Sequence, residues 1–291
     1  MALSEFTSCT VCGSNSIPAL NGYEAAHLCK CSNCTFVFAK KIPTESELIA
    51  HYETYPRTNS ISAITIKRYN ELLDTLEKFR NTNNLIDVGC GDGFFLETAK
   101  RRNWNVYGTE YTDQALKICK EKGIHMHQGK LDAINYPPNF FDVITSFEVI
   151  EHINNPKEEL QHFSKILRKG GAVYVTTPNF NSVSRYTLKS KWNVIEYPEH
   201  LSYYTQKTLS YLFRSENFSI DSFQTTGISL SRFQKSIGHP ASSNTNGVSK
   251  DEELRAKTET KLLYKLAKKL LNATLTLFRA GDTLKGLFIK K

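Results

Sequence analysis

Four cysteines near the N-terminus have the spacing of a metal site. They form two Cys-x2-Cys pairs with eighteen residues between the pairs, and the four are Cys9, Cys12, Cys31 and Cys34. Two such pairs bind a tetrahedral zinc ion through thiolate sulfur, and four cysteines leave no open position for catalysis. A module of about forty residues has too small a core to fold without such a cross-link. We therefore expect a structural zinc ion, with Cys29 and His27 as further candidate ligands.

A glycine-rich turn is the second chemical signal. In LIDVGCGDGFF, a β-rich run leads into the turn and then into a helix, whose N-terminus presents unpaired N–H groups. Gly89 and Gly91 let the backbone approach a ligand closely. A dinucleotide fingerprint needs a glycine at position 94, where this chain has Phe94. Nicotinamide binding is therefore disfavoured.

Two acidic residues accompany this turn. Asp87 precedes it and can accept hydrogen bonds from a ligand or from the N–H groups of the turn. Glu110 ends the next predicted strand, where a carboxylate can bind both hydroxyls of a ribose. The pair favours an adenosyl ligand without a pyrophosphate. The alternative is that Asp87 caps a loop and Glu110 is solvated.

A third group of polar residues follows a later strand. Glu148, Glu151 and His152 are spaced so that a helical turn directs all three side chains into one patch, and His200 comes from a loop expected near the same cleft. Two carboxylates and two imidazoles can bind a hydrated divalent ion, which lowers the pKa of an acceptor hydroxyl and orients it. Alternatively, His152 acts alone as a general base, because its neutral ring can take the hydroxyl proton.

The elements that position these residues alternate between strand and helix from Asn84 onward. Strands are expected over 84–90, 105–111, 124–129, 140–148, 172–178, 218–226 and 285–291, and helices over 93–103, 112–123, 156–171 and 205–217. Such alternation predicts an α/β fold with a mainly parallel sheet covered by helices. We divide the chain into a zinc-binding module (1–40), a helical linker (41–83) and a main domain (84–291) with a partly helical insertion at about 227–282.

Several segments resemble class I S-adenosylmethionine-dependent methyltransferases, and in particular O-methyltransferases of the ubiquinone-biosynthesis type. They are LIDVGCGDG, Glu110, FFDVITSFEVIEH, LRKGGAVYVTTPN and GDTLKGLFIKK, and the likeness covers about residues 84–291. The resemblance implies a Rossmann-like, doubly wound sheet of seven strands with an antiparallel last strand. A zinc-ribbon-like module would precede that sheet.

The resemblance also implies roles for single residues. Gly89 and Gly91 would pass beside the methionine part of S-adenosyl-L-methionine, and Glu110 would bind its ribose. The Leu131 region would flank the adenine, and Phe147 would line the cleft near the methyl group. The ExxEH pattern with a distal histidine resembles metal-using O-methyltransferases, but it is also widespread among methyltransferases that need no metal.

Basic residues concentrate at the C-terminal end of the chain. Residues 261–291 hold eight Lys or Arg and one acid, while the net charge of the whole chain is +8. Within 261–278, an apolar stripe alternates with lysines on other faces; its members are Leu263, Leu266, Leu270, Ala273 and Leu277. This helix can cap its own domain, meet a dimer partner or make peripheral contact with an anionic membrane surface.

Composition limits the location of the protein. With 40% hydrophobic residues the chain can bury an ordinary core. No run approaches the ~18 apolar residues that span a bilayer, and the start MALSEFTSCT has no features of a secretion signal. We expect a cytoplasmic protein, with the inner membrane face as a peripheral site.

These patterns lead to three hypotheses about function. The first is O-methylation of a small-molecule or saccharide acceptor, including a lipid-linked one, with sugar C-methylation as a close competitor. The second is methylation of ribosomal or transfer RNA, although residues 1–40 contain Lys30 and Lys40 as their only basic residues and would attract phosphate poorly. The third is a non-catalytic protein that binds an adenosyl ligand.

Overall fold

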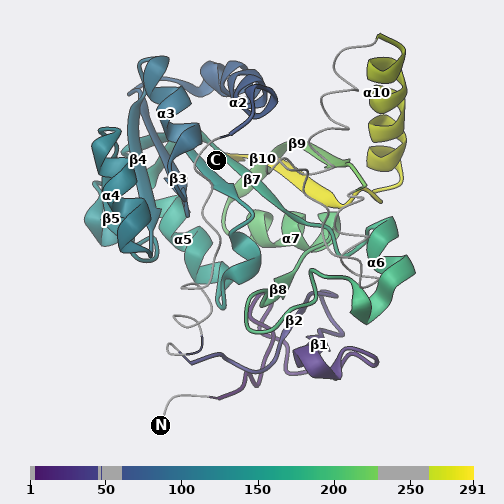
Figure 1. Ribbon diagram of the computed structural model, residues 1–291. Helices are drawn as coiled ribbons and strands as arrows, with labels where there is room; N and C mark the ends of the chain where they lie inside the picture. Colours follow the sequence, from purple (N-terminus) through teal and green to yellow (C-terminus); the bar gives the residue numbers. More distant parts are fainter. Residues whose placement is uncertain (1–3, 45–46, 48–60, 229–261) are drawn as a thin grey trace. The chain divides into compact units, whose positions relative to one another are not determined.

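The computed structural model describes residues 4–44, 47, 61–228 and 262–291 (Figure 1). The helix expected from Pro43 onward and the segment SIGHPASSNTNGVSK lie largely or wholly outside these residues. The chain folds into two compact units, each built from several segments. We call Met1–Ile42, Thr177–Thr208 and Phe223–Lys285 the cysteine unit, and Pro43–Thr176, Leu209–Ser222 and Gly286–Lys291 the sheet unit.

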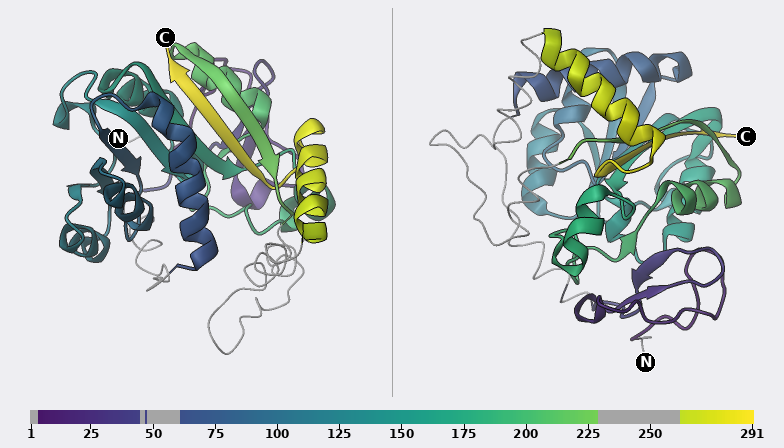
Figure 2. Two further views of the ribbon diagram at one scale, coloured as in Figure 1. Left: turned by 90° about the horizontal axis from the view of Figure 1, so that it is seen from above. Right: turned by 90° about the vertical axis from the view of Figure 1, so that its right-hand side faces the viewer.

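A seven-stranded sheet has the order β5-β4-β3-β6-β7-β10-β9. Its strands are β3 (Asn84–Val88), β4 (Asn105–Glu110), β5 (His125–Gln128), β6 (Phe141–Phe147), β7 (Leu167–Pro178), β9 (Phe218–Thr226) and β10 (Thr283–Lys290). The five strands from β5 to β7 are parallel. Lys290 at the end of β10 donates to the Leu167 carbonyl at the start of β7, so β10 is antiparallel. Figure 2 (left) shows β9 and β10 pointing in opposite directions. The predicted fold class is confirmed.

The structure contains the strands and helices that the sequence predicts from Asn84 onward, although their first and last residues differ from the predicted ones. The helices are α2 (Ala63–Leu76), α3 (Phe94–Arg101), α4 (Asp113–Glu121), α5 (Pro156–Ile166) and α7 (Gln206–Ser215), with 3-10 turns η2 (Glu77–Phe79), η3 (Ala133–Asn135) and η4 (Ile150–His152). Ser62 caps α2 by accepting a hydrogen bond from the Thr65 N–H. The helix predicted over 156–171 ends at Ile166, because Leu167 is buried as the first residue of β7 and pairs with Phe141 of β6.

The core of the sheet unit joins α2, α3 and α4 to one face of the sheet. Leu73 and Leu76 of α2 pack in one cluster with Phe95, Leu96 and residues of β3, β4 and β6. Leu287 of β10 belongs to this cluster, whereas its neighbour Phe288 stacks on Phe213 of α7 at 3.6 Å between ring centroids. Because adjacent strand residues face opposite ways, α7 covers the other face. Helix α2 is therefore part of this core.

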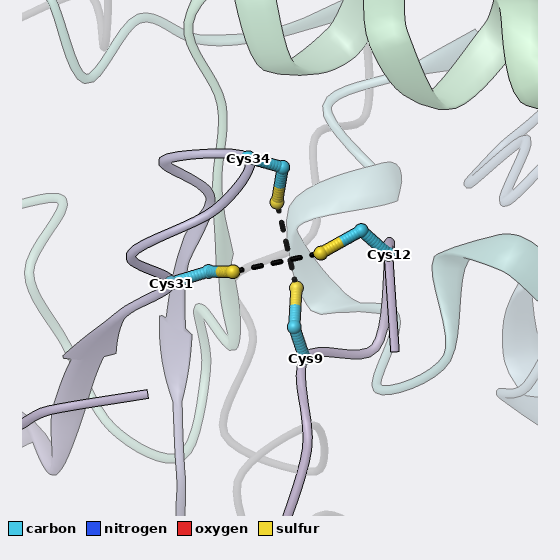
Figure 3. Close-up of side chains that lie close together, drawn as sticks. All are labelled: Cys9, Cys12, Cys31 and Cys34. Carbon is cyan, nitrogen blue, oxygen red and sulfur yellow. Dashed lines mark hydrogen bonds between the residues drawn. The ribbon is translucent and has the colours of Figure 1, made fainter. Parts of the chain in front are cut away.

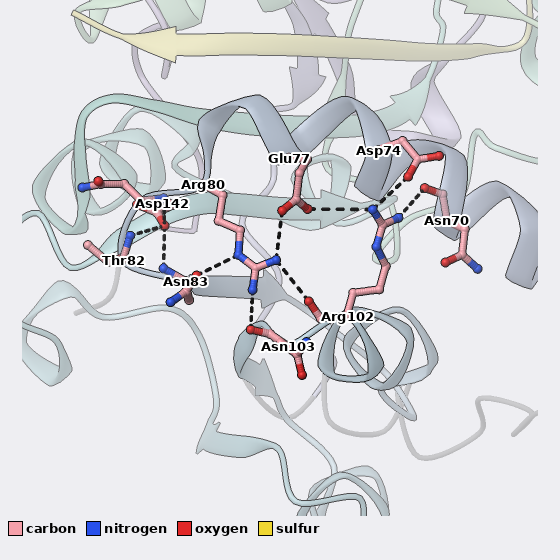
Figure 4. Close-up of polar contacts among 10 residues, drawn as sticks. Asn70, Asp74, Glu77, Arg80, Thr82, Asn83, Arg102, Asn103 and Asp142 are labelled. Carbon is pink, nitrogen blue, oxygen red and sulfur yellow. Dashed lines mark hydrogen bonds and ion pairs between the residues drawn. The ribbon is translucent and has the colours of Figure 1, made fainter.

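A polar network holds the loops at the amino ends of β3 and β4 (Figure 4). Arg80 donates to the Glu77 carboxylate at 2.9 Å and to the Asn83 side-chain oxygen at 2.7 Å. Arg102 pairs with Asp74 at 2.8 Å. Asp142, 0% exposed, accepts hydrogen bonds from several backbone N–H groups that precede β3. These contacts fix the end of the sheet opposite the glycine-rich turn.

The cysteine unit has a small sheet of three antiparallel strands, β1 (Leu28–Lys30), β2 (Val37–Ala39) and β8 (Ser202–Tyr203). Its core combines residues near the N-terminus with residues far along the chain, among them Leu28, Val37, Phe180, Trp192 and Tyr203. The unit also contains η1 (Glu24–Ala26), α6 (Val183–Leu188), η5 (Lys189–Lys191) and α10 (Leu262–Leu277). The segment 1–40 thus shares its sheet and core with residues 180–203, while the predicted domain boundaries stay a prediction.

No helix within the described ranges is long and apolar enough to cross a bilayer.

Candidate cofactor and acceptor site

The glycine-rich turn connects the end of β3 to the start of α3. Gly89 and Gly91 have φ values of 68° and 53°, in the left-handed region that glycine tolerates best. A Cβ atom on Gly89 would lie 2.6 Å from Cγ2 of Val149, so this position has no room for a side chain. The turn is also tied to β4, since Gly89 N–H donates to the Thr109 hydroxyl and Cys90 N–H to the Thr109 carbonyl. The backbone conformation is therefore fixed by its neighbours.

Glu110 lies beside this turn, as its position at the end of β4 predicts. Its Oε2 accepts a hydrogen bond from the Gly91 N–H at 3.0 Å, and its Oε1 accepts one from the Tyr111 N–H at 2.8 Å. The carboxylate is thus held between the glycine turn and the loop after β4. A carboxylate in this place can bind the two hydroxyls of a ribose.

Asp87 is buried directly before the turn, with 3% of its surface exposed. Within the described residues, its carboxylate accepts one side-chain hydrogen bond, from the Thr145 hydroxyl at 2.7 Å. Burial raises the pKa of Asp87 to about 8; the Thr145 hydroxyl opposes this shift, and the nearby Glu110 charge adds to it. A buried carboxyl group with so few donors has room to accept hydrogen bonds from a ligand.

Phe147 and Leu131 have different surroundings. Phe147 ends β6, is half-buried and packs edge-on against Phe95 at 5.0 Å between centroids. Tyr69 of α2 approaches Phe147 at 6.3 Å, and burial raises the pKa of its hydroxyl to about 12. Leu131 is 0% exposed, so its side chain packs inside the protein, and adenine contact in this region stays a prediction.

The acceptor residues predicted at the end of β6 come together on one short segment. Glu148 has a left-handed φ of 53°, and its N–H donates to the Thr176 carbonyl of β7 at 3.0 Å. Glu151 and His152 follow in the 3-10 turn η4, where Glu151 is 2% exposed and His152 half-buried. Val149, between them and Glu148, packs on Gly89. The segment therefore lies against the glycine-rich turn.

His200 belongs to the cysteine unit, whereas Glu148, Glu151 and His152 belong to the sheet unit. Its Nδ1 lies 2.7 Å from the Val194 carbonyl oxygen, which can accept only a hydrogen bond. The ring therefore carries a proton on Nδ1, which donates to this carbonyl. A shared acceptor site of His200 with the other three residues, and a divalent ion there, stay predictions.

Residues that sequence reasoning missed also shape this site. Thr145, Val149 and Tyr69 contact the predicted cofactor residues Asp87, Gly89 and Phe147, respectively. A threonine within the apolar run of a buried strand was a usable signal for Thr145. Nothing in the spacing marks Val149 or Tyr69, because their partners lie about sixty to eighty residues away in the chain.

The four predicted cysteines converge in the cysteine unit (Figure 3). Their sulfur atoms all lie within 4.8 Å of one another; Cys9 and Cys34 are 3.6 Å apart, and Cys12 and Cys31 are 3.5 Å apart. Two sulfurs bound at ~2.3 Å to one tetrahedral zinc ion lie about 3.8 Å apart. A disulfide needs about 2.05 Å, so the cluster has the spacing of a metal site and not of two disulfides.

Hydrogen bonds stabilise one thiolate of this cluster. The Cys34 thiol and the N–H groups of Val11 and Cys12 lower the pKa of Cys9 to about 5. The two other candidate ligands lie apart from the cluster. Cys29 donates to the Phe38 carbonyl, and burial raises the pKa of its thiol to about 12, while the His27 ring packs edge-on against Tyr197.

Comparison with known proteins agrees with this geometry. The family described as "Methyltransferase domain" matches residues 63–222, more than half of the chain. Ubiquinone biosynthesis O-methyltransferase of Nitrosomonas europaea is 29% identical over 133 residues, which are 43% of this chain and 55% of that protein. The mitochondrial enzyme of the same name from Saccharomyces cerevisiae is 32% identical over 126 residues, 40% of each chain. The chain thus spans about half the length of these relatives.

A solved structure is similar in fold. The crystal structure of a SAM-dependent methyltransferase from Archaeoglobus fulgidus aligns with a TM-score of 0.52 over 85% of this chain and all of that one, at 17% identity. The order of strands, the glycine-rich turn with its two carboxylates and the family match agree. The chain belongs to the methyltransferase-domain family and is a class I S-adenosylmethionine-dependent methyltransferase.

Proposed function

We propose that this enzyme methylates a hydroxyl oxygen of a small-molecule or saccharide acceptor, including a lipid-linked one. The observation that carries the proposal is the contact of Val149 with Gly89, because it sets the Glu148–His152 segment against the glycine-rich turn, where we expect the cofactor. The relatives named above are O-methyltransferases, which supports oxygen as the atom methylated. An acceptor hydroxyl bound at this segment would be close to the methyl donor.

The chain's own residues have a limited task in this chemistry. S-adenosylmethionine, when bound, supplies an electrophilic methyl group, so the protein must orient the acceptor, exclude water and accept the hydroxyl proton. We assign the proton to the imidazole of His152, because a neutral imidazole has a ring nitrogen that can accept a proton. The buried Glu151 and the neighbouring Glu148 would orient this ring or the acceptor.

The variant His152→Gln tests the assignment. We expect kcat to fall about 100- to 10,000-fold, with the affinity for S-adenosylmethionine unchanged. His125→Gln, at an exposed position on β5, is the matched control and should keep full activity. Equal kcat values for wild type and His152→Gln would remove His152 as the base.

A divalent ion at the acceptor residues is the alternative mechanism. Glu148, Glu151, His152 and His200 offer carboxylate and imidazole ligands suited to such an ion. Activity should then disappear with EDTA and return with magnesium. Activity indifferent to both would leave proton transfer to His152 alone.

We also propose that the cysteine cluster holds a structural zinc ion. Four thiols at these distances satisfy tetrahedral coordination without an open position, which fits a folding role and not a catalytic one. Protein purified without chelators should contain one zinc ion per chain, and Cys31→Ser should lose the metal. Cys29→Ser, outside the cluster, should keep it. None of the seven cysteines forms a disulfide bond, which supports a reducing compartment such as the cytoplasm.

The rival hypotheses differ in where a labelled methyl group goes. The protein should be incubated with labelled S-adenosylmethionine and fractionated extract. Label in small-molecule, glycan or lipid fractions supports the proposal, and base-stable label on carbon favours sugar C-methylation. Label in RNA would favour the RNA hypothesis. Tight cofactor binding with no label in any fraction would favour a non-catalytic protein.

A further inference from the structure

Helix α10 presents apolar side chains to solvent. Leu266, Leu270 and Leu277 are 55%, 71% and 76% exposed, and Phe278, directly after the helix, is 69% exposed. The leucines are spaced by four and seven residues, so they lie on one face of the helix. Leu271 widens this face at 48% exposure. We call these five residues the α10 apolar face. Large apolar side chains grouped in this way mark an interaction surface.

The opposite side of α10 holds the helix to its own unit. Leu275 is 7% exposed, and the Thr276 hydroxyl donates to the Thr225 carbonyl at 2.9 Å. The Asn272 side-chain oxygen accepts a hydrogen bond from the Gly227 N–H at 3.0 Å. Figure 2 shows the helix beside β9 and β10 in both views. The α10 apolar face is therefore not needed for attachment of the helix to its unit.

One exposed lysine borders the α10 apolar face. At about 100° per residue, Lys269 lies about 60° beyond one edge of this face, whereas half-buried Lys268 falls between Leu275 and Asn272 on the side that holds the helix to its unit. Helix α10 carries three lysines and no acidic residue. A helix with exposed leucine and phenylalanine on one face and lysine at its border is typical of segments that lie in the interface of an anionic membrane. A second copy of this helix would bring lysines against lysines.

We propose that the α10 apolar face binds the surface of an anionic lipid bilayer. Leu270, Leu277 and Phe278 enter the boundary between headgroups and acyl chains, and the long side chain of exposed Lys269 reaches lipid phosphates. This interaction goes beyond methyl transfer and does not depend on which acceptor is used. It would hold the enzyme at the place where a lipid-linked acceptor is found.

The test is flotation of the full-length protein with lipid vesicles. Wild-type protein should float with vesicles of phosphatidylcholine containing about a third phosphatidylglycerol at low salt, and less with phosphatidylcholine alone or at high salt. Leu270→Ser/Leu277→Ser should lower vesicle affinity at least tenfold. Lys269→Gln should lower it about fivefold on anionic vesicles, since one basic residue contributes roughly that factor.

Control variants outside α10 test whether vesicle binding depends on the α10 apolar face or on any exposed apolar or basic residue. Ile134→Ser removes an 80% exposed residue of η3, and Lys117→Gln removes an exposed lysine of α4. Both should bind vesicles like wild type. Wild-type protein that stays unbound at low salt, or α10 variants that float equally well, would overturn the proposal. So would a wild-type dimer, seen by light scattering, that Leu270→Ser/Leu277→Ser converts to a monomer. S-adenosylmethionine binding by each variant, measured separately, reports on the methyltransferase site alone.

Discussion

Asp87 and Asp142 are both buried aspartates on neighbouring strands, yet their surroundings differ. Oδ2 of Asp142 accepts hydrogen bonds from the N–H groups of Asn81, Thr82 and Asn83 at 2.7–2.9 Å, and Oδ1 accepts one from Arg168 at 2.6 Å. Asp87 accepts one from Thr145 within the described residues. Both are at most 3% exposed. The two aspartates are therefore similarly buried, but the carboxylate of Asp142 accepts more hydrogen bonds from the protein than the carboxylate of Asp87 does.

The difference follows the direction of the strands. Asp142 is at the amino end of β6, where its carboxylate oxygens close the turn that leads into β3. Asp87 is at the carboxyl end of β3, beside the glycine-rich turn. In open α/β sheets, ligands bind beyond the carboxyl ends of the strands. The chain itself supplies the donors of Asp142, which indicates a structural role, whereas Asp87 has few donors at the end of the sheet where ligands bind, so we expect it to contact the cofactor.

Removal of Asp142 should have the largest effect on folding. Asp142→Ala leaves three N–H groups and the Arg168 guanidinium without their buried acceptor, so the free energy of unfolding should fall by about 3–5 kcal/mol. Urea denaturation followed by circular dichroism measures this loss. Asp221→Ala, which breaks an exposed pair with Lys78, should cost less than about 1 kcal/mol. Equal losses in the two variants would contradict a structural role for Asp142.

Replacement of Asp87 should instead affect ligand binding. Asp87→Asn keeps the shape of the side chain but replaces one acceptor oxygen with an NH2 group and removes the ability to ionise, so affinity for S-adenosylmethionine should fall about 10- to 100-fold. The free energy of unfolding should not fall, because the variant cannot lose stability through ionisation of this buried group. Titration calorimetry and urea denaturation together measure both. If Asp87→Asn unfolded as easily as Asp142→Ala, the two aspartates would not differ in role.

The raised pKa of Asp87 should also make the free energy of unfolding depend on pH. Burial raises the pKa of Asp87 from 3.8 to about 8, so the folded state holds a proton that the unfolded state has lost between these pH values. This contribution to stability is fully present below about pH 4 and disappears as pH rises to about 8. Unfolding in urea across this range should show a downward slope that Asp87→Asn reduces. An unchanged slope in the variant would mean that Asp87 is ionised when folded.

Local patterns predicted the sheet and the positions of several candidate residues. Alternating apolar runs marked the strands, and the order of strand, glycine turn and helix predicted that Gly89, Gly91 and Glu110 lie together, as they do. The spacing within each Cys-x2-Cys pair is itself a local geometry, which is why the cluster of Cys9, Cys12, Cys31 and Cys34 was predictable. In each case, the signal lies within a few residues of the feature.

Contacts between distant parts of the chain were not predictable in this way. Strand β8 has two residues, too few for any periodic pattern, yet it completes the small sheet about 160 residues after β2. The hydroxyl of Thr145 reaches Asp87 because parallel pairing of β3 and β6 sets these two residues side by side. The contrast between Asp87 and Asp142 depends on such pairings, so sequence alone could suggest Asp87 but could not exclude a capping role.

The smallest expected effect concerns the one donor of Asp87. Thr145→Val removes the hydroxyl while keeping the volume of the side chain, and loss of that hydrogen bond should raise the pKa of Asp87 further above its usual value. At neutral pH a smaller fraction of Asp87 is then ionised, so S-adenosylmethionine affinity should fall about three- to tenfold and recover at higher pH. Calorimetry from pH 6 to 9 measures the shift. In an Asp87→Asn background, Thr145→Val should no longer change the pH dependence of binding, since the titrating carboxyl group is absent. A shift that persisted there would assign the effect to another group.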